Sequence, residues 1–134
     1  MDVLIATHQG TGYLVAVIVL VVAAMAFGRA RDAREFTPGP YVLAAVSLDL
    51  QVLLGLAVYG MGGFFGEGVS PLVQYVHPVL AILALVTAHV GLKRARRQQM
   101  AVAAHQAAGR ALVLALVLVF GAVLTATVGA RGLV

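Results

Sequence analysis

The sequence contains no cysteine and very few charged residues. Only 10% of its 134 residues are Asp, Glu, Lys or Arg, whereas 62% are hydrophobic, and the mean hydropathy is +1.02. The absence of cysteine excludes disulfides, thiolate metal sites and iron–sulfur clusters held by cysteine, so a cofactor has only His, Met, carboxylate or backbone ligands to use. The scarcity of charge excludes an ordinary water-soluble domain, and we expect the chain to lie in a lipid bilayer.

Four apolar stretches are long enough to cross a membrane, since a hydrocarbon core of about 30 Å needs roughly 20 apolar residues in a helix. They cover about residues 3–28, 41–61, 71–92 and 109–129. A Thr-Pro-Gly-Pro turn at 37–40, a glycine-rich segment at 62–68 and a polar stretch at 98–106 separate them. Ser70 followed by Pro71 is typical of a helix N-cap. Connections this short predict an all-α, up-down-up-down four-helix bundle.

The positive charges fall almost entirely on one side of this arrangement. Eight of the nine Lys and Arg flank one set of span ends, namely Arg29, Arg31, Arg34, Lys93, Arg94, Arg96, Arg97 and Arg110, and only Arg131 flanks the other. Because cytoplasmic loops are rich in Lys and Arg, we expect both termini on the outer side of a multi-pass protein of the bacterial plasma membrane. The same placement accounts for the pI of about 10.1, so the expected partner is lipid and not nucleic acid.

Polar residues inside membrane spans are candidate functional residues because they are costly there. The strongest pair is His8 and His77, which lie in the outer portions of two spans that run in the same direction. A rise of about 1.5 Å per residue places them at depths that differ by several Å, which a helix tilt of about 20° absorbs. Two imidazoles facing each other across a bundle are what a six-coordinate b-type haem needs as axial ligands.

Several neighbouring residues favour a haem beside this pair. Gly12 lies on the His8 side of its helix and leaves space for a ring. Haem propionates need a cation, and Arg131 is the only one on the outer side, with Tyr13 and Gln74 as hydrogen-bond donors. The alternative is a solvated, interfacial His8 and a His77 that is hydrogen-bonded to a neighbouring helix.

His89 and His105 flank the basic inner segment and predict a second haem site there. The alternative is that His105 lies in a polar loop among glutamines. Asp49 is expensive as an exposed carboxylate in lipid, so we expect it to hydrogen-bond another helix, with a proton relay as the alternative role. Gln51 begins a small and polar stripe, spaced at four residues, that we expect to face the bundle interior.

A set of residues in the first three spans resembles a known family. These residues are His8, Gly12, Arg29 and Arg31, then Leu48, Gln51 and Gly55, then His77 and the basic run from Lys93 to Arg97. In this order they resemble the first histidine helix, the glutamine-glycine helix and the next histidine helix in one four-helix half of heme A synthase. The resemblance implies a haem on the outer side with His8 and His77 as axial ligands.

The chain departs from this family at its reactive motif. The family's active half carries Glu-x-x-His-Arg, whereas the corresponding residues here read Ile5-x-x-His8-Gln9. The carboxylate and the arginine are both missing, so we expect no oxidation of a haem methyl group and no enzyme of that type.

Two functions therefore follow from the sequence. The first is a membrane b-type haem protein that transfers electrons or holds haem, with one haem, room for a second, and a quinone or a redox protein as partner. The second is a cofactor-free small membrane subunit or a proton-coupled transporter. Small multidrug transporters need a glutamate inside the first span, and here Glu35 and Glu67 both fall in loops. Either function is compatible with a homo-oligomer.

Overall fold

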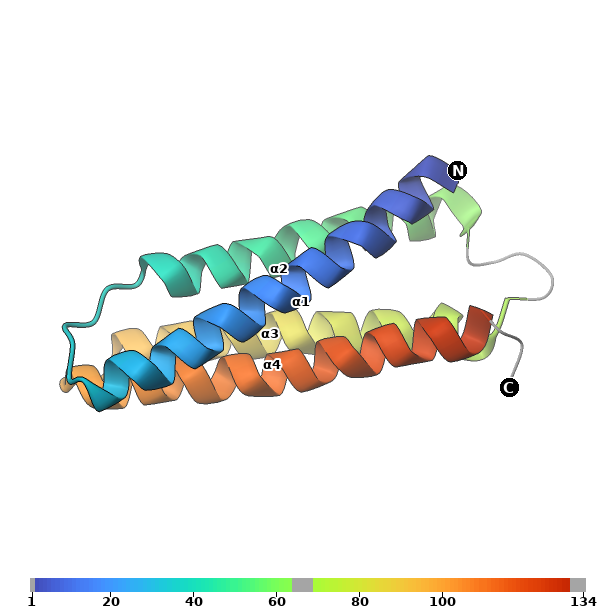
Figure 1. Cartoon of the computed structure of the whole chain (residues 1–134). Helices are drawn as coiled ribbons and strands as arrows, with labels where there is room; N and C mark the ends of the chain where they lie inside the picture. Colours follow the sequence, from blue (N-terminus) through green and yellow to red (C-terminus); the bar gives the residue numbers. More distant parts are fainter. Residues whose placement is uncertain (1, 64–68, 131–134) are drawn as a thin grey trace.

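The computed structural model describes residues 2–63 and 69–130 and is all α-helical. Its elements are α1 (Asp2–Arg31), α2 (Gly39–Val58), the π-helical turns η1 (Tyr59–Gly63) and η2 (Leu72–Val76), α3 (His77–Arg96) and α4 (Ala101–Ala130). Consecutive long helices run in opposite directions and form a four-helix bundle, in which α1 begins at the end where α4 finishes (Figure 1). Four helices are long and apolar enough to cross a membrane, which confirms the expected number of spans.

The helices continue beyond the apolar stretches. α1 extends to Arg31, α3 extends to Arg96, and α4 begins at Ala101, eight residues before the span expected from residue 109. Alanine, arginine, lysine and glutamine are all good helix formers, so a helix does not stop where the hydropathy falls. Most of the polar stretch at 98–106 is therefore the first part of α4, and not a loop.

Buried apolar side chains are concentrated in one half of the bundle. We call this the packed half: residues 15–31 of α1, 39–48 of α2, 84–96 of α3 and 101–116 of α4. In the other half, which we call the open half, only Val58 and Ala122 are buried apolar side chains among the described residues. Alanine dominates the packed core, so these helices approach each other closely, as membrane helices do at small residues.

The closest approach in the packed half joins α3 to α4. A Cβ atom added to Gly91 would lie 2.0 Å from the Cβ of Ala111. A Cβ added to Gly109 would lie 3.1 Å from the Cβ of Ala26, where α4 meets α1. Side chains at these two positions are therefore limited by the neighbouring helix, and the packed half forms a rigid base from which the open half extends.

Candidate functional site

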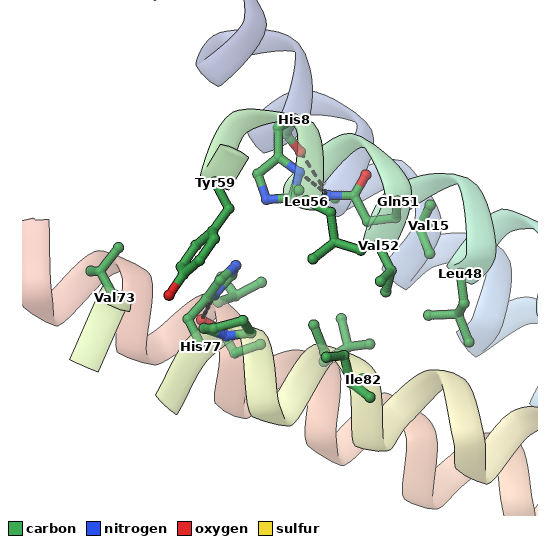
Figure 2. Close-up of a pocket in the computed structure, with 17 residues that line it drawn as sticks. His8, Val15, Leu48, Gln51, Val52, Leu56, Tyr59, Val73, His77 and Ile82 are labelled. Atoms are coloured by element: carbon green, nitrogen blue, oxygen red, sulfur yellow. Dashed lines mark hydrogen bonds between the residues drawn. The ribbon is translucent and has the colours of Figure 1, made fainter. Parts of the chain in front are cut away.

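The open half contains a cavity of about 80 Å³ between the four helices. Figure 2 shows the side chains that line it, with His8 from α1 and His77 from α3 reaching in from opposite sides. Apart from these histidines, Gln51 and Tyr59, the lining is glycine, alanine, proline and branched apolar side chains. The cavity thus places two imidazoles in apolar surroundings, and such concave, mainly apolar pockets with a few polar groups are typical of cofactor sites.

The two imidazoles lie close together, as the sequence predicted. The ring centres of His8 and His77 are 6.0 Å apart and the ring planes cross at 82°. Both residues are half-buried. An interfacial, solvated His8 is therefore not what the structure shows, because its ring faces His77 inside the bundle.

His77 is oriented by a hydrogen bond to α4. Its Nδ1 donates to the carbonyl oxygen of Ala122 at 2.8 Å. This is the helix-to-helix bond that the sequence offered as an alternative, but it uses only one ring nitrogen. Since Nδ1 carries the proton, Nε2 of the neutral ring has a free lone pair, and this is the arrangement that metal-binding histidines commonly show.

A π-helical turn places His77 at the start of α3. Proline lacks an amide proton and its ring disturbs the turn before it, and Pro78 follows His77 directly. The backbone N–H of His77 bonds to the carbonyl of Leu72, five residues back. The Ser70 hydroxyl caps this end as predicted, accepting a bond from the Leu72 N–H at 3.3 Å. Widened turns of this kind often occur at functional sites.

Gln51 of α2 connects to His8 by two contacts. Its amide nitrogen donates to the backbone carbonyl oxygen of His8 at 2.8 Å and lies 3.1 Å from His8 Nδ1. The Thr11 hydroxyl donates to Gln51 Oε1 at 2.7 Å. Gln51 therefore binds the first turns of α1 to α2 and holds the ring of His8 from behind.

The stripe that begins at Gln51 faces the cavity, as expected. Gly55 and Tyr59 both line the cavity, and Figure 2 shows the ring of Tyr59 reaching toward His77. A Cβ added to Gly55 would lie 2.9 Å from Cε1 of His8, and one added to Gly12 would lie 3.0 Å from Nε2 of Gln51. Gly12 is thus at the cavity as predicted, and both glycines are needed for the present position of His8 and Gln51.

Two of the residues expected to bind haem propionates lie elsewhere. Tyr13 is 59% exposed and does not line the cavity, because it is one residue beyond Gly12 and points to a different face of α1. Gln74 is half-buried in η2 and is also outside the lining. Arg131 lies outside the described residues.

The expected polar loop around His105 is a correction. His105 lies in α4 with no exposed surface, and both of its ring nitrogens are hydrogen-bonded. Nδ1 accepts from the Tyr41 hydroxyl at 2.5 Å, and Nε2 donates to the Arg34 carbonyl at 3.1 Å. Phe36 stacks on the ring of Tyr41 with centres 5.4 Å apart. His105 therefore anchors the α1–α2 connection, and in this state it has no nitrogen left for a second haem.

His89 has a different partner. Its Nε2 lies 2.9 Å from Oδ1 of Asp49, and both side chains are partly exposed. The expected helix-to-helix hydrogen bond of Asp49 is thus confirmed, and it joins α2 to α3. His89 and His105 have separate partners, so the structure does not bring them together as a pair.

Sequence reasoning did not find Thr11, because a threonine in an apolar helix ordinarily bonds its own backbone. Thr11 also lies 2.8 Å from the Thr7 carbonyl, which is that ordinary bond. Within residues 2–63 and 69–130, no three His, Asp or Glu side chains gather to hold a metal ion. Comparison of the chain with protein-family models, curated proteins and solved structures finds no match.

Proposed function

We propose that this chain is a haem b protein of the bacterial plasma membrane, which binds haem in the cavity between His8 and His77 for electron transfer or haem holding. The observation that carries the proposal is the 6.0 Å separation of the two ring centres. Bonds from a metal to imidazole nitrogen are about 2 Å long, so one metal ion between two such rings would hold their centres roughly 6 Å apart.

The donor set favours haem over a bare metal ion. The cavity offers two imidazoles, and no third His, Asp or Glu of the described residues joins them. Two protein ligands are too few for a stable site of a bare transition metal, which has four or more. In haem the porphyrin supplies four nitrogens and the protein supplies only the axial ligands. The bond from His77 Nδ1 to the Ala122 carbonyl fits a proximal ligand.

The cavity must widen to admit the macrocycle, because its volume of about 80 Å³ is smaller than a porphyrin. The open half can provide this space, since so few of its apolar side chains are buried. Leu56 and Ile82 line the cavity and are also exposed, so they lie at its rim, where they can turn toward lipid. When bound, the haem would supply one-electron redox chemistry, while the apolar lining would exclude water.

The charges support an orientation for this site. Arg29 and Arg31 end α1, and Lys93, Arg94 and Arg96 lie in the last turn of α3, all at the end of the packed half. Cytoplasmic ends of membrane spans are rich in such residues. We therefore infer that the packed half lies on the cytoplasmic side and the histidine cavity lies toward the outer side.

The test is the absorption spectrum of the protein purified from haem-replete cells. We expect a red protein with a Soret band and a sharp α band after reduction. His77→Ala should lose at least most of the haem because it removes the only imidazole with a free Nε2. His89→Ala is the matched control: this histidine is partly exposed and paired with Asp49, outside the cavity lining, so its loss should leave the spectrum unchanged. A colourless wild-type protein would contradict the proposal.

The cofactor-free alternative is supported by one observation, the Asp49–His89 pair. Two protonatable groups 2.9 Å apart on adjacent spans have the composition of a proton relay. This function predicts a colourless protein that carries protons across liposome membranes, with transport lost in Asp49→Asn. Transport of this kind by a colourless protein would establish the alternative in place of the haem protein.

A further inference from the structure

The contacts of Gln51 determine which way its amide points. A backbone carbonyl oxygen only accepts hydrogen bonds, so the Gln51 atom 2.8 Å from the His8 carbonyl must be the amide nitrogen. The Thr11 hydroxyl, whose oxygen is 2.7 Å from Gln51 Oε1, can donate to that oxygen. The oxygen and nitrogen of an amide are assigned from such partners, and here both partners indicate the same orientation.

This orientation places a donor against Nδ1 of His8. Nε2 of Gln51 lies 3.1 Å from that ring nitrogen, and the amide has a second N–H to give after the first has bonded the carbonyl. Nδ1 is therefore the acceptor. In a neutral imidazole the proton then lies on Nε2, the nitrogen on the side of the ring toward His77 in Figure 2.

His77 has the opposite arrangement. Its proton lies on Nδ1, which donates to the Ala122 carbonyl, and its Nε2 has the free lone pair. The two rings that face each other are therefore one donor and one acceptor, and not two ready ligands. His8 becomes a ligand through Nε2 only if its proton moves to Nδ1, where the N–H would face an N–H of Gln51.

We propose that Gln51 holds His8 as a hydrogen-bond donor, so that His77 alone anchors the haem and the opposite axial position is open to a small external ligand. This inference rests on the proposed function. The ligand class is a small, uncharged diatomic molecule that accepts a hydrogen bond, because the surroundings are almost entirely apolar and His8 Nε2–H is the donor that faces it. Gln51 is a positioning residue that acts through His8.

Gln51→Glu tests this with almost no change in shape. A carboxyl group in place of the amide presents an oxygen to Nδ1 of His8 and so favours the proton there, which leaves Nε2 bare. We expect wild-type ferric protein to show a high-spin spectrum and wild-type ferrous protein to bind carbon monoxide. Gln51→Glu should turn the ferric spectrum low-spin and weaken carbon monoxide binding by about tenfold or more, because His8 then competes for the iron. Gln74→Glu, outside the cavity lining, is the control and should resemble wild type.

A second pair of variants separates the two histidines. His8→Ala should keep the haem and bind carbon monoxide, with a shifted vibrational frequency of the bound gas because the donor is gone, whereas His77→Ala should lose the haem. A low-spin wild type that ignores carbon monoxide, equal haem loss in both variants, or a Gln51→Glu spectrum like that of wild type would each overturn the inference while leaving the haem function in place. Haem loss in Gln51→Glu without a change of spin state would also overturn it. Colourless wild-type protein overturns the proposed function, and this inference with it.

Discussion

The four histidines of this chain differ in how many ring nitrogens are already engaged. His105 uses both nitrogens, and His77 uses Nδ1 alone. The sequence indicated all four as candidates because each is costly in an apolar helix. It could not rank them, since the partner of a histidine comes from another helix: the Arg34 carbonyl is 71 residues from His105 in the chain.

Tyr41→Phe should destabilise the fold without changing the haem site. The substitution removes the hydroxyl that donates to His105 Nδ1 and leaves a fully buried acceptor unpaired. Unsatisfied buried polar groups cost about 1–3 kcal/mol, and hydrogen bonds between membrane helices average about 0.6 kcal/mol. We expect a loss of about 1–2 kcal/mol in the free energy of unfolding, measured by denaturation in mixed detergent micelles.

Tyr13→Phe is the control for this prediction, because the same hydroxyl is removed from an exposed side chain. It should leave stability unchanged. Equal stability of Tyr41→Phe and wild type would show that the bond between Tyr41 and His105 contributes nothing to the fold. A haem content that falls with Tyr41→Phe alone would show that the inner cluster communicates with the cavity.

At the scale of the helices, the sequence predicted the number of spans and their order but not where the helices end. α4 begins at Ala101 because the alanines that precede the apolar span are good helix formers and some of them are buried, such as Ala104 and Ala108. A hydropathy pattern marks where lipid begins, and helical structure continues past that point. His105 was placed in a loop for this reason alone.

The contact between α3 and α4 depends on Gly91. Its backbone approaches α4 so closely that an added Cβ would lie 2.0 Å from the Cβ of Ala111. Gly91→Ala should therefore force the two helices apart, and overpacking of this kind costs about 1–3 kcal/mol. The loss should appear as a lower midpoint of unfolding in detergent.

Gly28→Ala is the matched control in the packed half, since an added Cβ there has no atom within 4 Å. Alanine is favoured over glycine inside a helix by about 1 kcal/mol, so this variant should be as stable as wild type or more stable. If Gly91→Ala behaves like Gly28→Ala, then α3 and α4 separate at little cost, and the packed half is not the rigid base that its geometry indicates.

At the scale of the whole molecule, the division into a packed and an open half could not be predicted from the sequence. Apolar residues face both the core and the lipid in a membrane bundle, so Val19, which is fully buried, and Val21, which is exposed, have the same composition signal. Only small residues carry a hint, and alanine and glycine occur in both halves. The cavity follows from how the helices meet, while the two histidines beside it were visible as polar residues in apolar spans.

The orientation in the membrane is testable because the chain has no cysteine of its own. Met61 lies in η1 at the open end and is 59% exposed, and Met100 lies in the turn before α4 at the packed end and is 68% exposed. In intact spheroplasts a membrane-impermeant maleimide should label Met61→Cys. It should label Met100→Cys only after the membrane is permeabilised, because the basic residues that flank this turn favour the cytoplasm.

The labelling result also bears on the site, since the open half carries His8, His77 and the cavity. Labelling of Met61→Cys from outside would place a haem in this cavity near the outer surface, where a partner on that side of the membrane could exchange electrons with it. The reverse pattern would mean that eight basic residues had been moved across the membrane, against the rule by which Lys and Arg set orientation. The cavity would then lie on the cytoplasmic side. The haem proposal would survive that outcome, because it depends on the two rings and not on the side they face.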